Sequence, residues 1–166
     1  MDARPYLVRV AELLHRHKLE AILIGNAAAA LQGAPVTTID VDFLFRRTPA
    51  NIRKLKAMAR DLEAVVMRPY YPVSPLWRLT RDVDGLQIDF MDEIHGLRSF
   101  EGLRKRASIT RLGDTELLVA ALADIIKSKK AAGRPQDLAV LPLLEKVLEE
   151  TAHDQGRKAP EPEKGQ

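Results

Sequence analysis

EAILIGNAAAALQGAPVTTIDVDFLF, residues 20–45, is the stretch of the chain that decides the fold. Its apolar run 20–24 ends at Gly25 and predicts a buried strand. The following segment, 26–33, begins with asparagine and ends with glycine, which predicts a short helix. Residues 37–45 alternate in polarity and contain β-branched and aromatic side chains, so they predict a second strand. A mixed α/β core around these elements follows.

Two carboxylates on the strand 37–45 are the first candidates for chemistry. Asp40 and Asp42 point to the same side of the strand, because side chains alternate between its faces. At about 7 Å apart they repel each other, and a divalent cation offsets that repulsion. Magnesium favours such oxygen ligands together with substrate phosphates. A chain with twelve Asp also produces an Asp-x-Asp pattern by chance, and residues 82–84 (DVD), followed by glycine, are interpreted as a turn.

A third carboxylate is expected from the strand 86–91, LQIDFM. Asp89 faces away from the apolar side of that strand. If the strand pairs beside 37–45, Asp89 joins the other two carboxylates in a site suited to two-metal phosphoryl chemistry, where it is a candidate general base. The alternatives are that Asp89 is an ordinary exposed strand residue, or that Asp92 takes its place. Asp92 falls on the opposite face unless a bulge intervenes.

The turn at Gly25-Asn26 provides a candidate phosphate site. Glycine at a strand-to-helix turn lets the backbone approach a ligand closely, and a helix start offers free N–H groups to a phosphate. Asn26 is equally well explained as a plain helix cap.

The remaining sequence predicts further helices and strands on both sides of this core. Residues 68–75 contain three prolines and predict an irregular loop. The expected elements are helices at 5–18, 48–63, 99–106, 114–131 and 136–150, and strands at 64–67, 76–81, 86–91 and 107–112. These ranges divide the chain into an α/β core (1–112), a helical C-terminal part (113–151) and a disordered tail (152–166).

Composition excludes several classes of protein. The 166 residues include no cysteine, which rules out disulfides and thiolate metal sites and fits a cytoplasmic protein. No signal peptide and no apolar run long enough for a membrane span is expected. The net charge of +3 suits a polyanionic partner such as a nucleotide or RNA, although solvated helix faces are the simpler explanation.

Two runs together resemble the DNA polymerase beta-like nucleotidyltransferase superfamily. The first contains Ile24-Gly25-Asn26-Ala27, Gly33-Ala34-Pro35 and Thr38-Ile39-Asp40-Val41-Asp42, and the second is Lys129 to Asp137, KKAAGRPQD. The chain is most similar to the minimal bacterial branch that includes abortive-infection (AbiE-type) toxins. The similarity covers roughly residues 20–145, and both runs occur in the expected order.

The resemblance implies an α+β fold: a nucleotidyltransferase-type mixed sheet flanked by helices, with a helical C-terminal part. It implies that Asp40, Asp42 and Asp89 bind magnesium, with two ions expected, and carry catalysis. The implied substrate is a nucleoside triphosphate, and the implied nucleotide-binding residues are Gly25, Asn26, Thr38, Lys129 and Arg134. The acceptor hydroxyl would belong to RNA, a protein or a small molecule, and a toxin with an antitoxin partner is one role that the resemblance implies.

Three positions depart from the family pattern. Asn26 replaces the usual second Gly or Ser, Val36 replaces an Arg found in many members, and Val140 replaces a second Asp. The loss of a basic residue near the phosphates weakens nucleotide binding. The alternative function is therefore a non-catalytic nucleotide- or RNA-binding module with the same fold, acting as a regulatory or antitoxin-like subunit.

Overall fold

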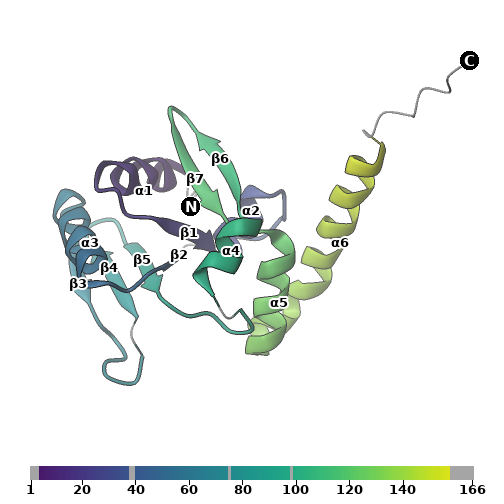
Figure 1. The fold of residues 1–166 in the computed structure, drawn as a ribbon. Helices are drawn as coiled ribbons and strands as arrows, with labels where there is room; N and C mark the ends of the chain where they lie inside the picture. The colour runs from purple at the N-terminus through teal and green to yellow at the C-terminus, as the bar shows by residue number, and fades with distance from the viewer. Residues whose placement is uncertain (1–3, 38–39, 75, 98, 158–166) are drawn as a thin grey trace, which may run out of the picture.

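A seven-stranded mixed sheet forms the centre of the molecule, in the order β3-β4-β5-β2-β1-β7-β6 (Figure 1). This computed structural model describes residues 4–37, 40–74, 76–97 and 99–157. The strands are β1 (Ala21–Ile24), β2 (Val41–Phe45), β3 (Val65–Met67), β4 (Trp77–Arg81), β5 (Leu86–Met91), β6 (Ser108–Leu112) and β7 (Thr115–Val119). The helices are α1 (Arg4–Arg16), α2 (Gly25–Leu31), α3 (Pro49–Asp61), α4 (Phe100–Arg106), α5 (Leu122–Ala132) and α6 (Pro135–Arg157).

The register of β2 and β5 fixes the two faces of the sheet. These strands are parallel neighbours, with Asp42 beside Asp89 and Phe43 beside Phe90. The two phenylalanine rings stack with centroids 5.2 Å apart on the buried face. Because side chains alternate along a strand, the same register places the two carboxylates side by side on the other face. The expected pairing of 86–91 beside the strand that carries Asp42 is therefore confirmed.

Helix starts follow local sequence signals. Thr48 accepts a hydrogen bond from the backbone N–H of Asn51, and Pro49 occupies the first turn of α3. Ser99 caps α4 in the same way by accepting from the N–H of Gly102. A side-chain oxygen at this position satisfies one of the N–H groups that a helix start leaves unpaired.

The helices contact different strands of the sheet and one another. Helix α1 contacts β6, β7 and α3, while α2 contacts β1, β2 and α5. Helices α5 and α6 form an antiparallel pair, and α6 extends away from the body (Figure 1). No described helix has the length and apolar character needed to cross a membrane. The architecture confirms the expected α+β class with a helical C-terminal part.

The segment after Gly113 corrects one prediction. Residues 115–119 were expected to begin a helix, but they form β7, which pairs antiparallel with β6 and parallel with β1. Their Leu and Glu residues favour a helix locally, yet strand pairing on both sides outweighs that weak preference. The sheet therefore takes its seventh strand from the part of the chain that was expected to be helical.

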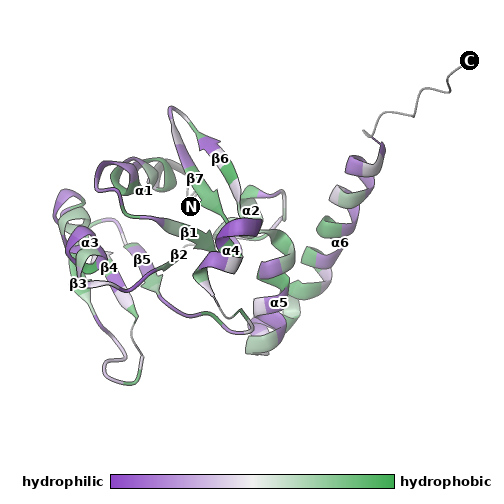
Figure 2. Cartoon of the chain, viewed as in Figure 1, coloured by the Kyte–Doolittle hydropathy of each residue, from purple (hydrophilic) through white to green (hydrophobic). Residues whose placement is uncertain are grey.

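The C-terminal helix corrects a second prediction. Helix α6 runs to Arg157, although residues from 152 onward were expected to be disordered. Its final turns are exposed and hydrophilic, as Figure 2 shows. Hydrogen bonds within the helix backbone, rather than burial of side chains, maintain these turns. The rest of the expected tail, 158–166, lies outside the described residues.

Candidate functional site

A cleft of about 1030 Å³ opens beside the polar ends of β2 and β5. Its lining comes from the start of α2, from these two strands and from the α5–α6 pair. The residues that sequence reasoning selected and that line this cleft are Gly25, Asn26, Asp40, Asp42, Asp89, Lys129 and Arg134. Segments far apart in the sequence therefore converge on one space. Thr38, the remaining candidate, lies outside the described residues.

Asp42 is the most perturbed carboxylate in the cleft. Burial, followed by the charges of Asp89 and Asp40, raises its pKa from 3.8 to about 6. Within the described residues its carboxylate forms no hydrogen bond or ion pair that would offset these effects. Lys129 and Arg134 oppose the increase from across the cleft, but only partly. An acid kept without a close partner in a cleft is a typical feature of a functional site.

Gly25 approaches Asp42 so closely that a side chain at this position would press against the carboxylate. The antiparallel register of β1 and β2 pairs Ile24 with Asp42, which brings the start of α2 to the carboxylate. A Cβ atom on Gly25 would lie 3.0 Å from Oδ2 of Asp42, and the backbone there has φ of +69°. Glycine tolerates both conditions, whereas any other residue would meet strain and a contact.

Asn26 lies beside this approach. Its Oδ1 atom is buried and has no hydrogen-bond partner in the described part of the protein. The residue before the helix, Ile24, supplies no side-chain cap for α2. The expected capping role of Asn26 is therefore not observed, because Asn26 lies inside the first turn rather than before it. A buried amide oxygen without a partner costs free energy unless a ligand or water satisfies it.

Asp89 is held by a cation that the sequence reasoning missed. Arg78 donates from Nε to Oδ1 at 2.8 Å and from Nη2 to Oδ2 at 2.9 Å. Asp89 is 7% exposed, so this two-point ion pair is largely shielded from solvent. Both oxygens of the third carboxylate are thus engaged by Arg78.

The other acidic residues near the cleft differ in their surroundings. Asp40 is exposed, and Nε2 of Gln87 lies 3.5 Å from its Oδ1. Asp92 was expected to face away from the site, but β5 ends at Met91 and Asp92 lines the cleft, with its Oδ2 3.3 Å from Nε of Arg47. Across the described ranges, no three His, Asp or Glu side chains are arranged to hold a metal ion among themselves.

The cations of the cleft are tied together by a buried acid. Asp137 is 2% exposed and accepts from Nε of Arg134 at 2.6 Å and from Nζ of Lys129 at 3.4 Å. Burial alone would raise its pKa, but the hydrogen bond and charge of Arg134 and the charge of Lys129 lower it below the usual value. Asp137 therefore fixes both side chains at the end of the α5–α6 pair.

Two residues that shape this site were available from the sequence but were not selected. The turn at 82–85 sets the register of its hairpin, and counting back from Arg81 and Leu86 places Arg78 opposite Asp89. Asp137 ends the run 129–137, which resembles the family pattern, and it lies three residues after Arg134 on the same helical turn. Both signals concern partners of the candidate residues rather than the candidates themselves.

Solved structures show the same arrangement of elements. A lincosamide antibiotic adenylyltransferase, LnuA, with lincomycin bound superposes with a TM-score of 0.63 at 12% identity, covering 86% of this chain and 96% of that protein. The antibiotic-resistance factor ANT(2'')-Ia gives 0.62 at 15% identity, covering 96% and 95%. A Thermotoga maritima protein provisionally named a nucleotidyltransferase gives 0.60 at 20% identity, covering 88% and 92%.

No protein-family model and no curated protein sequence matches this chain. The structural likenesses are between proteins of low sequence identity, so they establish the fold. The chain has the nucleotidyltransferase fold over nearly its whole described length.

Proposed function

We propose that this protein transfers a nucleotidyl group from a nucleoside triphosphate to an acceptor hydroxyl and releases pyrophosphate. The single observation that carries the proposal is the placement of Asp42. A half-buried carboxylate with a raised pKa faces the glycine-led start of α2, beside Asp40 and Asp89 and opposite two cations. The fold shared with two antibiotic-modifying nucleotidyltransferase structures supports the same reaction class.

Magnesium fits the residues on one side of the cleft. Asp40 and Asp42 offer the oxygen ligands that this ion prefers, and a cation would relieve the repulsion that raises the pKa of Asp42. When bound, the ion would neutralise phosphate charge and polarise the reacting phosphoryl group. Asp89 fits less well in the described state, because both its oxygens already accept from Arg78. The expectations that Asp89 also binds magnesium and that two ions are present therefore stay predictions.

The other residues bind and orient the nucleotide. Lys129 and Arg134 provide positive charge across the cleft from Asp42, where the phosphates of a triphosphate would place negative charge. Gly25 leaves room for the ligand, and the unpartnered Oδ1 of Asn26 would accept a hydrogen bond from the nucleotide or its water. Asp89 would take the proton of the acceptor hydroxyl once Arg78 releases one of its oxygens.

The acceptor and the cellular role belong to the same proposal. RNA, a protein side chain and a small molecule all supply a hydroxyl, and the two named antibiotic-resistance proteins have structures with lincomycin and with adenylyl-2''-tobramycin. A cytoplasmic toxin controlled by an antitoxin protein is the role implied by the sequence resemblance.

A non-catalytic nucleotide- or RNA-binding module is the second candidate. The specific observation in its favour is the Arg78–Asp89 ion pair, which occupies the group that would otherwise act as base. Val36 and Asn26, where the family pattern has other residues, point the same way. This candidate predicts nucleotide binding without turnover.

The test combines calorimetry and turnover. A non-hydrolysable triphosphate titrated with magnesium measures binding, and labelled triphosphate incubated with RNA or lysate measures transfer. Transfer that requires Asp42, judged with Asp42→Asn, supports the enzyme. Binding without transfer supports the module, and transfer that survives Asp42→Asn refutes the proposed site. Asp82→Asn, in the exposed second Asp-x-Asp pattern, is the matched control.

A further inference from the structure

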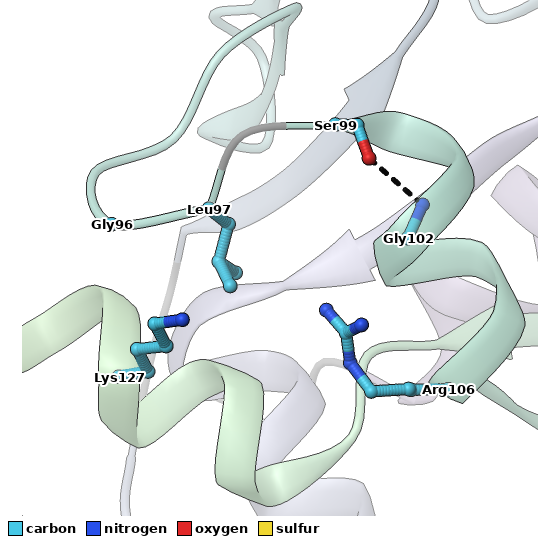
Figure 3. Close-up of a pocket in the computed structure, with 6 residues that line it drawn as sticks. All are labelled: Gly96, Leu97, Ser99, Gly102, Arg106 and Lys127. Carbon is cyan, nitrogen blue, oxygen red and sulfur yellow. Dashed lines mark hydrogen bonds between the residues drawn. The ribbon is translucent and has the colours of Figure 1, made fainter.

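A second, smaller pocket of about 260 Å³ lies beside the main cleft. The loop before α4, α4 itself and α5 surround it, and its lining residues are Gly96, Leu97, Ser99, Gly102, Arg106 and Lys127. We call it the side pocket. Figure 3 shows the guanidinium of Arg106 and the ammonium of Lys127 pointing into the same space next to Leu97 (Figure 3). Neither cation was used in the proposed reaction.

Arg106 is fixed at one point and keeps donors for another partner. Its Nε donates to Oδ2 of Asp124 at 2.8 Å; Asp124 is 6% exposed, whereas the Arg106 side chain is 52% exposed. Among the described residues, the two terminal nitrogens of the guanidinium have no hydrogen-bond partner. Two parallel donors in one plane suit the oxygens of a carboxylate or a phosphate.

Lys127 adds an uncompensated charge to the same pocket. Within the described ranges it forms no ion pair, and the nearest acid along its helix, Asp124, is already engaged by Arg106. Two like charges aimed into one space repel each other, and an anion between them converts that repulsion into attraction. The pocket therefore presents a surplus of positive charge without a partner of its own.

Two glycines allow close packing around the side pocket. A Cβ on Gly102 would lie 2.9 Å from the Ser99 hydroxyl oxygen, which is too close, and 3.6 Å from one terminal nitrogen of Arg106, which is an ordinary contact. A Cβ on Gly96 would lie 2.7 Å from the Cβ of Ala131, so glycine lets this loop rest directly on α5. Ser99 accepts from the N–H of Gly102, which leaves its own O–H hydrogen to donate.

The side pocket adjoins the main cleft. Leu97 lines both spaces, and Asp124, which anchors Arg106, lines the main cleft. A ligand group in the side pocket therefore lies beside the cleft that would hold the reacting nucleotide. Its volume exceeds that of several water molecules at about 30 Å³ each, which is enough for a phosphate and part of its carrier.

We propose that the side pocket binds a phosphate group carried by the acceptor, through Arg106, Lys127 and Ser99. The assignment of the phosphate to the acceptor rests on the proposed transferase function, whereas anion binding by the pocket does not. A phosphate held there would place the rest of the acceptor toward the main cleft with a hydroxyl available for transfer. Acceptors without a negative group would lose this contact and, if cationic, would be repelled.

The experiment titrates three probes into the full-length protein and follows backbone amide signals by NMR. The probes are inorganic phosphate, ribose 5-phosphate and ribose. Inorganic phosphate is expected to shift the signals of Gly96, Gly102 and Lys127. Ribose 5-phosphate is expected to shift these and also Leu97 and Asp124 at the junction, while ribose alone is expected to shift none.

The variants separate the pocket from general surface charge. Lys127→Met keeps the Arg106–Asp124 ion pair intact, and Arg106→Met/Lys127→Met removes both cations. Roughly tenfold weaker phosphate binding is expected for the single variant, the effect of losing one charge-assisted contact. Arg106 and Lys127 are themselves exposed, so the control must be equally exposed. Lys105→Met/Lys130→Met, which removes two exposed cations outside the pocket from the same two helices, is expected to bind like the wild type.

The outcomes distinguish this proposal from the proposed function. Equal phosphate binding by the wild type and both pocket variants, or no binding by the wild type, overturns the side-pocket site. Phosphate binding without any preference for ribose 5-phosphate over ribose supports an anion site and overturns its assignment to the acceptor. Absence of nucleotidyl transfer by the wild type, with its phosphate binding present and weakened in the pocket variants, refutes the transferase and leaves the anion site established.

Discussion

Asp42 and Asp137 are two carboxylates that line the same cleft but have opposite electrostatic surroundings. Burial and two neighbouring acids raise the pKa of Asp42 to about 6. Asp137 is also buried, yet Arg134 and Lys129 lower its pKa below the usual value. Among the described residues, Asp42 forms no ion pair, whereas Asp137 is paired with two cations. The difference separates a carboxylate that is left available to a ligand from one whose oxygens are engaged within the protein.

The same contrast recurs at Asp89. Arg78 engages both of its oxygens, so Asp89 resembles Asp137 in its pairing while lying next to Asp42 in the sheet. Proximity to Asp42 therefore does not decide whether a carboxylate is paired. Asp89 is paired because Arg78 lies opposite it on the neighbouring strand β4.

Asp42→Asn is expected to have the largest effect, on activity. Removing a carboxylate that binds the reacting phosphoryl group through a metal should lower the rate of nucleotidyl transfer by about 10³-fold, as for other groups that stabilise developing charge. A labelled-triphosphate assay measures it. Asp82→Asn should keep the wild-type rate. An Asp42→Asn rate within a few-fold of the wild-type rate would show that Asp42 has no catalytic role.

Asp137→Asn is expected to have the largest effect on stability. The change leaves two cations without their shared acid. Arg134 is 63% exposed, but Lys129 is only 12% exposed, and breaking a buried ion pair of this kind costs about 3 kcal/mol. Urea unfolding measures the loss. The loss should shrink as the pH falls below the usual carboxyl range, because a group with a lowered pKa stabilises the fold only while it is charged. Asp154→Asn, at an exposed site near the end of α6, is the control.

Asp42→Asn should change stability in the opposite direction. A carboxyl whose pKa is higher in the folded state than in the unfolded state destabilises the fold when it is ionised. The variant should therefore be more stable than the wild type by about 1–2 kcal/mol at pH 8, after allowance for partial exposure. The gain should disappear as the pH falls from 6 to below 4, where both side chains are neutral. If Asp42→Asn were less stable than the wild type at pH 8, the conclusion that burial and neighbouring acids raise the pKa of Asp42 would be wrong.

Lys130→Met should have the smallest effect. Its ion pair with Glu145 also joins α5 to α6, at 2.7 Å, but both side chains are well exposed. Exposed pairs contribute less than about 1 kcal/mol, so the unfolding midpoint should hardly move. A loss comparable to that of Asp137→Asn would show that pairing of charges, rather than burial, stabilises the helix pair.

The sequence predicted the positions of the candidate carboxylates better than it predicted the residues that pair with the candidate side chains. Alternation along two strands was enough to place Asp42 and Asp89 on one face, because a period of two leaves little choice once one face is apolar. Arg78 and Asp137 were missed because a single strand or helix does not show its partners. Only the hairpin register and the spacing along α6 carry that information.

The two errors in secondary structure have physical causes. Residues 115–119 contain Leu and Glu, whose helical preference is a fraction of a kcal/mol per residue and is outweighed by pairing with two strands. The glycine and aspartate at 113–114 form the turn that signals this hairpin. The end of α6 was placed too early because its polar composition resembles that of a disordered tail, although no proline interrupts residues 143–157.

Asp137 also couples two residues mechanically. Asp137 binds both Lys129 on α5 and Arg134 at the turn into α6, so a tilt of this helix pair would move the two cations together. Gly133, which has a left-handed backbone conformation, forms the bend between the two helices. A cross-link that restrains α6 far from the cleft would therefore act on both cations at once.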